Sequence, residues 1–331
     1  MLDIVQVGLG PLGRQIVHYA AERPQLRVVA AVDPAAGIAG RDLGELCDLP
    51  ANSIVVAATL DELPETAPAV AVLATFSSLE RVAGQIEELT AHRLDVVSTC
   101  EELSYPWAAH PETAARLDRL CRRQGVTCLG TGVNPGFLMD HLPAVLTGLC
   151  QRVERVVVRR VQDASARRVP FQQKIGAGLT PAEFEQKAAD GTLRHVGLAE
   201  SAHLLARAAG WRLDSVEEEL RPIIAEREVT SGYRPIAAGA ATGVEQVARG
   251  FAGGREVVRL EFRAGVGEPA PRDEIEIEGL PHIVSVIEGG VNGDVATCAA
   301  VLNAAPVVRA AAPGLMTMLD LPAPTVGRAA V

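Results

Sequence analysis

Short apolar runs and stretches with helical spacing alternate along the first 130 residues of the chain. The runs are continuous, which is typical of strands that are covered on both faces. They predict six strands, over residues 4–7, 28–32, 54–57, 69–74, 95–98 and 126–129. Strands that alternate with helices in this way predict an α/β fold with a doubly wound parallel sheet.

Two of the intervening stretches carry clear helix signals. Ser77 and Glu80 have the spacing of a capping box, in which each side chain bonds the backbone N–H of the other residue at the start of a helix. Residues 113–123 place Ala114, Leu117 and Leu120 at helical spacing. Both stretches therefore predict helices that connect neighbouring parallel strands.

The pattern changes after residue 133, where Asn134, Pro135 and Gly136 mark a turn. Longer alternating stretches then predict strands over residues 153–161, 217–229, 242–251, 256–264, 273–277 and 283–287. Helical spacing recurs over residues 180–189 and 198–209. We therefore expect a first domain over residues 1–133 and a second, α+β domain with an antiparallel sheet over residues 134–292.

The remaining segment, residues 293–331, begins with helical spacing over residues 294–305. We expect this helix to pack back onto the first domain. From Pro313 onward the segment is rich in proline and glycine, and it predicts an ordered arm or a frayed end.

A G-x-G-x-x-G motif joins the first predicted strand to the first helix. Gly8 permits a tight turn, Gly10 lets the backbone approach a pyrophosphate, and Gly13 lets helix and strand pack closely. Pro11 suits the first helical turn, and Leu12 starts the apolar face of the helix. The unpaired N–H groups of a helix start attract phosphates, so these five residues are predicted to bind a dinucleotide.

Asp33 ends the second predicted strand, 20 residues after Gly13, which is the spacing of a ribose-binding carboxylate. A carboxylate there accepts hydrogen bonds from ribose hydroxyls and repels a 2′-phosphate, so NAD is the favoured cofactor. Arg41 is the nearest downstream cation and leaves NADP open as an alternative.

Further candidates follow the other strands, because ligands of such sheets lie outside the carboxyl ends of the strands. Thr75, Thr99 and Asn134 are predicted to contact the cofactor. For the two threonines, a purely structural role at a strand end is an equal alternative.

Two adjacent carboxylates, Glu101 and Glu102, follow the strand predicted over residues 95–98, where a nicotinamide ring should lie. A carboxylate in a half-dry pocket beside a like charge has a raised pKa. That pKa suits a general acid or base near neutral pH. The alternative is that both residues only stabilise the N-terminus of a following helix.

Composition narrows the function classes. The 331 residues suffice for two domains, and 48% hydrophobic residues with a mean hydropathy of +0.17 suit a soluble protein. A net charge of −10 argues against binding to nucleic acid or to an anionic membrane. No membrane-length apolar run and no secretory signal are visible. Six cysteines without C-x-x-C spacing indicate reduced thiols in a cytoplasmic protein, and no metal site.

The chain resembles the dihydrodipicolinate-reductase-like branch of the Rossmann oxidoreductases. Within this branch it is most similar to the group of 2,4-diaminopentanoate dehydrogenases and native amine dehydrogenases. The resemblance covers nearly the whole chain. It is carried by the glycine motif and by residues 98–103 (STCEEL), 130–137 (GTGVNPGF), 194–201 (RHVGLAES) and 289–297 (GGVNGDVAT).

The resemblance implies NAD(P)H-dependent reductive amination of a small aldehyde or ketone with ammonia, the reverse oxidation of an amine, and a homodimer. It places the catalytic glutamate in the pair Glu101 and Glu102, and the position after the strand favours Glu101. A carboxylate can move protons between ammonia and the departing hydroxyl and stabilise an iminium cation. The alternatives are a 2,4-diaminopentanoate dehydrogenase, another amino-acid or alcohol dehydrogenase on the same fold, and a protein that only binds the cofactor.

We expect substrate-pocket walls from aromatic, apolar and polar residues after the glutamates and in the second domain. They are Tyr105, Trp107, Phe137, Leu138, Phe171, Gln172 and His195. For His195, a structural hydrogen-bonding role is an equal alternative.

A group of arginines bears on the substrate class. It comprises Arg159, Arg160, Arg167 and Arg168. One of them facing the pocket would bind a substrate carboxylate and indicate an amino-acid substrate. We favour the alternative, a solvated strand end.

Overall fold

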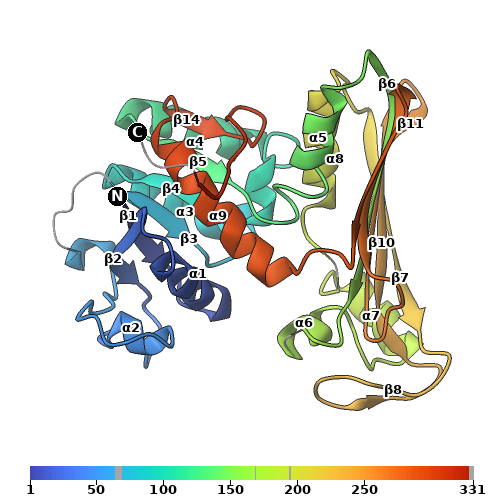
Figure 1. The fold of residues 1–331 in the computed structure, drawn as a ribbon, viewed down its shortest axis with the longest axis horizontal. Helices are drawn as coiled ribbons and strands as arrows, with labels where there is room; N and C mark the ends of the chain where they lie inside the picture. Colours follow the sequence, from blue (N-terminus) through green and yellow to red (C-terminus); the bar gives the residue numbers. More distant parts are fainter. Residues whose placement is uncertain (64–68, 168, 194, 328–331) are drawn as a thin grey trace. The chain divides into compact units, whose positions relative to one another are not determined.

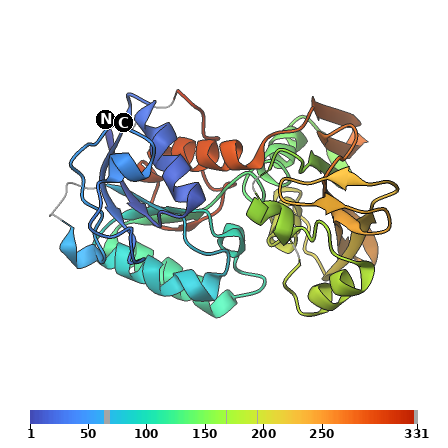
Figure 2. The same ribbon diagram turned by 90° about the horizontal axis from the view of Figure 1, so that it is seen from below.

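The computed structural model describes residues 1–63, 69–167, 169–193 and 195–327. The chain forms two compact units, which Figure 1 and Figure 2 show from two directions. Unit 1 comprises Met1–Phe137 together with Asn292–Val331, and unit 2 comprises Leu138–Val291. Each unit has its own six-stranded sheet.

Unit 1 is built on a sheet in which every neighbouring pair of strands is parallel. The strand order is β14-β5-β4-β3-β1-β2. The strands are β1 (Leu2–Val7), β2 (Leu26–Val32), β3 (Val70–Leu73), β4 (Asp95–Ser98), β5 (Thr127–Gly130) and β14 (Gly314–Met316). This is the doubly wound α/β architecture that the alternation of strands and helices predicts.

Helices cover both faces of this sheet. Helices α1 (Pro11–Ala21) and α9 (Gly293–Arg309) pack against one face, and α3 (Leu79–Ala91) and α4 (Pro111–Gln124) against the other. Each face of the sheet packs with its helices into a hydrophobic core, here called the α1/α9 core and the α3/α4 core. Strand β1 contributes to both, because Ile4 lies in the first and Val5 in the second. Full burial of such a side chain stabilises the fold by roughly 1.5–3 kcal/mol.

One expectation for unit 1, a strand over residues 54–57, was wrong. Residues 54–57 form only isolated bridges, because Ile54 and Val56 bond Leu43 and Arg41 and so cannot extend a ladder with β2. The sixth strand comes from β14, which pairs with β5. Of the two alternatives for the segment after Pro313, the ordered one holds over residues 314–316.

Unit 2 holds a mixed sheet of order β13-β12-β6-β11-β10-β7. Its strands are β6 (Arg152–Asp163), β7 (Ser215–Ile224), β10 (Ala241–Ala252), β11 (Arg255–Gly265), β12 (Arg272–Leu280) and β13 (Ile283–Glu288). Four neighbouring pairs are antiparallel as expected, whereas β6 and β11 are parallel. The long connection between β6 and β11 contains three helices, and such a crossover permits parallel pairing.

A separate short hairpin follows β7. The strand expected over residues 217–229 breaks after Ile224, and β8 (Val229–Thr230) pairs with β9 (Pro235–Ile236). The backbone N–H of Ala225 still donates to the carbonyl oxygen of Ala240, in register with β10, and the pairing of β7 with β10 ends there.

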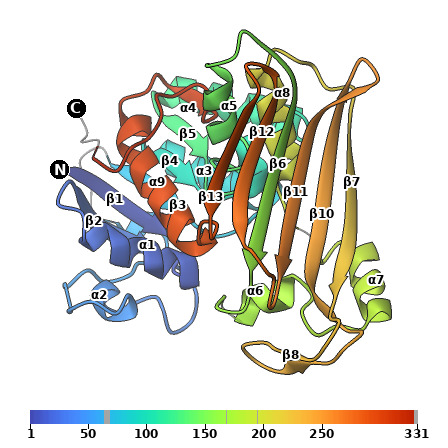
Figure 3. The same ribbon diagram turned by 45° about the vertical axis from the view of Figure 1, so that its right-hand side comes forward.

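The helices of unit 2 are α5 (His141–Thr147), α6 (Val169–Lys174), α7 (Pro181–Ala189) and α8 (Leu198–Ala208). Helices α5 and α8 pack on one face of the sheet, and Figure 3 shows the opposite face without a covering helix. In the part of the chain that the structure describes, no helix has the length and apolar character needed to cross a bilayer.

Candidate active site

The glycine turn after β1 has the geometry of a phosphate cradle. Gly8 has a φ of +88°, and a Cβ there would lie 2.6 Å from the carbonyl oxygen of Ala74. A Cβ on Gly13 would lie 2.0 Å from the carbonyl oxygen of Gly8. A Cβ on Gly10 would meet no atom within 4 Å, so the turn is open at this position. The first and third glycines shape the turn, and the second leaves room for a ligand.

The start of α1 completes the cradle. Gly10 is the N-cap residue without a side-chain cap, and Pro11 occupies the first helical turn. Leu12 is half-buried and packs against the α1/α9 core. Gln6, which the sequence reasoning missed, is fully buried on β1 and donates from Nε2 to the carbonyl oxygen of Gly8 at 2.9 Å. Its only signal is a polar residue inside an apolar strand.

The carboxylate of Asp33 lies beside this turn. It accepts hydrogen bonds from the backbone N–H groups of Leu9 at 2.7 Å and of Ala35 at 2.9 Å. Asp33 is 9% exposed, so these bonds form largely away from water. The bonds place the negative charge of the second strand against the glycine turn of the first.

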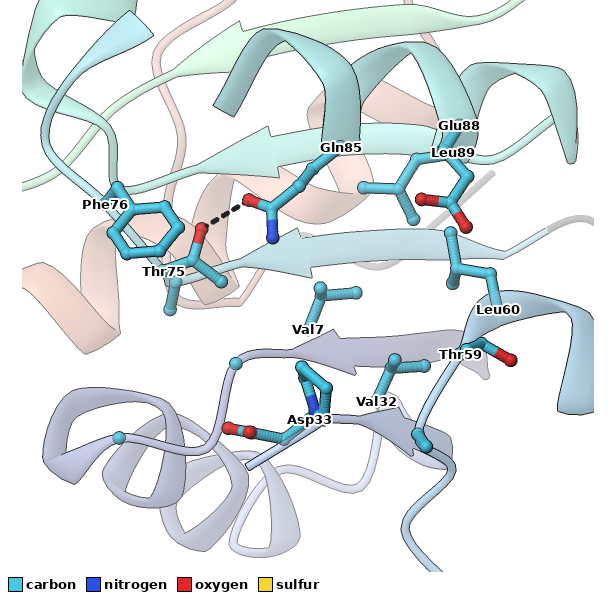
Figure 4. Close-up of a pocket in the computed structure, with 15 residues that line it drawn as sticks. Val7, Val32, Asp33, Thr59, Leu60, Thr75, Phe76, Gln85, Glu88 and Leu89 are labelled. Carbon is cyan, nitrogen blue, oxygen red and sulfur yellow. Dashed lines mark hydrogen bonds between the residues drawn. The ribbon is translucent and has the colours of Figure 1, made fainter. Parts of the chain in front are cut away.

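A pocket of about 390 Å³ opens over the carboxyl ends of β1, β2 and β3 (Figure 4). Asp33 and Glu88 are its two acidic lining residues, and the described lining contains no lysine, arginine or histidine. Of the cofactor candidates, Gly8, Gly10, Asp33 and Thr75 line it. The lining residues that sequence reasoning missed include Thr59, Leu60, Gln85, Glu88 and Leu89.

Arg41 and Thr99 lie outside the described lining of this pocket. Arg41 is exposed, and its backbone bonds Ile38 and Val56. Thr99 is half-buried directly after β4, where its N–H donates to Leu73 of β3. Thr99 therefore lies at the carboxyl ends of the central strands.

Glu102 is tied to the start of α3. Its Oε2 atom accepts a hydrogen bond of 2.7 Å from the backbone N–H of Leu79 and lies 3.3 Å from Nε2 of His110. Its own N–H donates to the carbonyl oxygen of Ser77. These contacts join the short helix η2 (Glu101–Ser104) to α3.

The capping box expected from Ser77 and Glu80 is absent. Helix α3 begins at Leu79, so Ser78 is the N-cap residue, and it makes no side-chain cap bond. Glu102 supplies the missing acceptor from 23 residues away in the chain.

Glu101 differs from its neighbour. The residue is half-buried at the start of η2, and its carboxylate makes no hydrogen bond or ion pair to any residue that the structure describes. The adjacent thiol of Cys100 is buried, and this burial raises its pKa to about 12. The Cys100 thiol therefore stays protonated near neutral pH.

Two segments that carry the family resemblance meet after β5. The N–H of Val133 donates to Oγ1 of Thr297 on α9, and the N–H of Thr131 donates to the carbonyl oxygen of Ser98. Asn134 is 7% exposed, and the following Gly136 has a φ of +119°. The ends of β4 and β5 and the start of α9 thus come together in unit 1.

Three predicted wall residues belong to unit 1. Tyr105 and Trp107 form an edge-to-face pair with ring centres 5.5 Å apart. Trp107 packs against the α3/α4 core, and Phe137 packs against the α1/α9 core. All three are half-buried, so each keeps some exposed surface.

Gln172 in unit 2 is fully buried. Its Nε2 donates to the carbonyl oxygens of Ala164 at 2.9 Å and Arg167 at 3.0 Å, and its Oε1 accepts from the N–H of Gly232 at 2.8 Å. The amide therefore holds the loop after β6 to the β8–β9 hairpin and has no exposed surface to offer a ligand. Neighbouring Phe171 is half-buried beneath the guanidinium of Arg167, which lies 4.0 Å from the ring centre.

His195 is half-buried in unit 2, and its ring stacks on Phe262 with centres 4.5 Å apart. Gln246 holds the backbone of His195 from both sides: Oε1 accepts from the N–H at 2.8 Å, and Nε2 donates to the carbonyl oxygen at 3.1 Å. Leu138, the first residue of this unit, is buried. Arg168 and Arg194 lie outside the described residues.

Arg160 points into the core of unit 2. Its Nη1 lies 3.0 Å from Oδ1 of Asp273, and its Nη2 donates to the carbonyl oxygen of Val291. Burial lowers the pKa of Arg160 to about 10 and raises the pKa of Asp273. Arg159 lies on the uncovered face of the sheet and pairs with Glu261, Glu274 and Glu276.

Comparison with known proteins identifies the family. Residues 137–330 match the model of the 2,4-diaminopentanoate dehydrogenase C-terminal domain, and residues 2–101 match that of the dihydrodipicolinate reductase N-terminus. A 2,4-diaminopentanoate dehydrogenase from Acetoanaerobium sticklandii is 31% identical over 333 residues, which cover 98% of this chain and 94% of the relative. The chain belongs to the 2,4-diaminopentanoate dehydrogenase family.

Two amine dehydrogenases are also similar over almost their whole length. One from Streptomyces virginiae is 25% identical and covers 99% of this chain and 98% of its own. The structure of one from Mycobacterium smegmatis has a TM-score of 0.84 at 26% identity and covers 97% and 96% of the two chains. The expected family and fold class are confirmed, and the chain is an NAD(P)-dependent oxidoreductase of the amine dehydrogenase type.

Proposed function

We propose that this protein catalyses the NADH-dependent reductive amination of a small aldehyde or ketone with ammonia, and the reverse oxidation of the primary amine. The observation that carries the proposal is the carboxylate of Glu101. It is half-buried after β4 and makes no hydrogen bond or ion pair within the described chain. The names of the similar proteins support the same reaction class.

The glycine turn fits a dinucleotide. Space at Gly10, the open N-terminus of α1 and the pocket beside Asp33 suit a pyrophosphate followed by a ribose and a base. When bound, the nicotinamide ring supplies a hydride in the aminating direction and accepts one in the other. Thr99 and Asn134, at the ends of β4 and β5, are proposed to contact the nicotinamide half.

We propose NAD as the preferred form of the cofactor. The described lining of the pocket contains two carboxylates, Asp33 and Glu88, and no cationic side chain that would bind a 2′-phosphate. Two unit charges about 4 Å apart near a protein surface repel each other by roughly 4 kcal/mol. Arg41 lies outside this lining, so it does not offset the repulsion there.

Glu101 is assigned the proton transfers. Its carboxylate takes a proton from the attacking ammonia and returns one to the departing hydroxyl, and its negative charge stabilises the iminium cation. Glu102 is assigned a positioning role, because Leu79 and His110 already engage its carboxylate. The wall residues Tyr105, Trp107 and Phe137 are proposed to exclude water beside the substrate.

The arginines favour a plain amine over an amino acid as the substrate. A substrate carboxylate needs a cation, but Arg160 is buried with Asp273, and Arg159 already pairs with three glutamates. The second candidate is the oxidation of 2,4-diaminopentanoate, which the 31% identical relative favours.

The test is a spectrophotometric assay of the purified chain with NADH, ammonium and a panel of short aldehydes and ketones. Oxidation of NADH that requires ammonium is expected, and NAD-dependent turnover of 2,4-diaminopentanoate alone would favour the second candidate. Oxidation of NADH by a carbonyl without ammonium would identify an alcohol dehydrogenase and overturn the proposal. Binding of NADH without any turnover would identify a binding protein.

We also propose a homodimer, formed through the uncovered face of the unit 2 sheet. Arginines and glutamates alternate there in a network that includes Arg155, Arg159, Arg259 and Glu256. A face that carries both signs of charge can pair with a second copy of itself across a two-fold axis. Light scattering at low and high salt would test this, with a dimer expected and a monomer under both conditions contradicting it.

A cytoplasmic location is proposed on the cysteines. All six are free thiols, and five of them are buried. Unpaired thiols suit a reducing compartment. Localisation of a fluorescent fusion of the full chain would check this proposal.

A further inference from the structure

Helix α3 presents two polar side chains, one turn apart, to the pocket beside Asp33. Gln85 and Glu88 both line it, and Figure 4 shows their polar ends directed toward the cavity between β1 and the helix. Neither residue was singled out by the sequence, where they read as an ordinary solvated helix face. Because both side chains line the pocket proposed for the cofactor, we ask which part of the cofactor they could bind.

Thr75 fixes the orientation of the Gln85 amide. Its Oγ1 donates a hydrogen bond of 2.7 Å to Oε1 of Gln85. Because the carbonyl side of the amide is engaged by the hydroxyl, the Nε2 side is left as a donor, and it points into the pocket in Figure 4. The carboxylate of Glu88 can only accept when it is ionised. The helix therefore offers one donor and one acceptor.

The other polar side chains of the lining have partners within the chain, and Asp33 is in addition assigned to the ribose. Thr59 donates to Glu62, Thr75 donates to Gln85, and Asp33 accepts the N–H groups of the glycine turn and of the β2 loop. The rest of the described lining is largely apolar, with side chains such as Val7, Val32, Leu60 and Leu89. Such walls suit the faces of a flat ring and leave its edge to be bound by α3.

We propose that Gln85 and Glu88 select adenine as the base of the dinucleotide. Adenine carries an exocyclic amino donor next to ring-nitrogen acceptors. The amino group would donate to Glu88, and a neighbouring ring nitrogen would accept from Nε2 of Gln85. This inference rests on the proposed function, since it assumes that the pocket holds the adenosine half of NAD.

Hypoxanthine is a suitable base for comparison, because it has nearly the same size and shape as adenine. Its 6-oxo group replaces the amino group and would place an acceptor against the carboxylate of Glu88. A site built to bond a donor rejects an analogue that lacks it, because its own polar group is left unpaired. The wild-type chain is therefore expected to bind NAD at least about tenfold more tightly than nicotinamide hypoxanthine dinucleotide.

The experiment measures dissociation constants of both dinucleotides by isothermal titration calorimetry with the full chain. Glu88→Gln supplies a donor for the 6-oxo group, so its preference for NAD is expected to fall to within about threefold. Thr75→Val releases the Gln85 amide and is expected to reduce the preference partly. Glu87→Gln is the control, because Glu87 pairs with Arg116 on α4 and is not part of the described lining. It should keep the wild-type preference.

Equal binding of the two dinucleotides by the wild type would overturn the inference. A Glu88→Gln variant that keeps the full preference would overturn it as well. Both results would leave the proposed function intact if ammonium-dependent oxidation of NADH is observed. If the chain binds neither dinucleotide, the proposed function and this inference both fail.

Discussion

The carboxylate of Glu102 accepts a hydrogen bond of 2.7 Å from the backbone N–H of Leu79 and thereby caps α3. Glu101, the next residue toward the N-terminus, makes no side-chain hydrogen bond or ion pair within the described chain. Two identical side chains in adjacent positions therefore have different surroundings. The carboxylate of Glu102 is engaged by the fold, and that of Glu101 has no partner within the described chain.

Glutamine substitutions should separate these roles. Glu101→Gln is expected to lower kcat by about 10²- to 10⁴-fold with an unchanged dissociation constant for NADH, because the proton transfers are lost. Glu102→Gln keeps an acceptor for the N–H of Leu79 and should retain most of its kcat. Steady-state kinetics and NADH titration check both variants. A larger loss of kcat in Glu102→Gln would reverse the assignment.

Two glycine variants should both bind NADH weakly but differ in stability. Gly13→Ala places a Cβ 2.0 Å from the carbonyl oxygen of Gly8, so we expect a loss of stability of about 1–3 kcal/mol together with weaker NADH binding. Gly10→Ala meets no atom within 4 Å and should unfold at the wild-type temperature, yet bind NADH poorly. Thermal unfolding and fluorescence titration check this. Normal NADH binding by Gly10→Ala would place the pyrophosphate elsewhere.

Asp33→Asn should shift the cofactor preference. Loss of the charge weakens bonds to ribose hydroxyls and relieves the repulsion of a 2′-phosphate, so kcat/KM for NADH should fall about tenfold or more. The ratio of NADPH to NADH efficiency should rise. Asp48→Asn, at an exposed position, is the control and should leave both values unchanged. An unchanged ratio in Asp33→Asn would remove Asp33 from cofactor selection.

Breaking the buried ion pair of Arg160 and Asp273 should lower the free energy of unfolding strongly. Replacing both residues together by apolar ones should lower it less. Arg160→Met leaves Asp273 buried without a partner, and we expect a loss of about 3–5 kcal/mol. The double variant Arg160→Met with Asp273→Leu should recover much of this. Arg221→Met removes an exposed ion pair with Glu219 and should cost at most about 1 kcal/mol. Urea denaturation measures the free energy of unfolding of each variant. Equal losses of this free energy in Arg160→Met and Arg221→Met would contradict the expectation.

Stability should fall as the pH drops below about 6.5, the ordinary pKa of histidine. Burial lowers the pKa of His203, and likewise that of His141, so the folded chain keeps them neutral while the unfolded chain takes up protons. The unfolded state then binds more protons, and the free energy of unfolding decreases until the lowered pKa is passed. His203→Gln should reduce the difference between pH 7.5 and pH 5.5 in urea denaturation. His282→Gln, at a largely exposed position, should not change it.

Local patterns predicted much of unit 1. The apolar runs of β1, β2 and β4 can be recognised from neighbouring residues alone. The same holds for the glycine turn from Gly8 to Gly13. Strand β14 has no local signal of this kind. Its three residues form a strand because they pair with β5, which is distant in the sequence. Strand β6 pairs in parallel with β11. The order and direction of strands in a sheet depend on how the chain between them runs, and the pattern of apolar residues within each strand does not determine this.

Candidate site residues could be named from the sequence where they follow strands. Asp33 stands directly after an apolar run, and Glu101 and Glu102 follow within a few residues of β4. General rules for parallel sheets draw attention to such positions. Gln85 and Glu88 have no such signal, since a polar residue on an amphipathic helix reads as solvated. The cap from Glu102 to Leu79 was missed because it joins segments 23 residues apart, whereas a capping box is a local motif.

The composition of unit 1 from two distant stretches of chain has a consequence for its biosynthesis. Helix α9 and strand β14 are translated after unit 2, although α9 buries residues such as Ile4 and Val72 of strands that precede unit 2. A ribosome-bound intermediate that has emerged only as far as unit 2 would expose that apolar face. The α1/α9 core can therefore close only after α9 has left the exit tunnel.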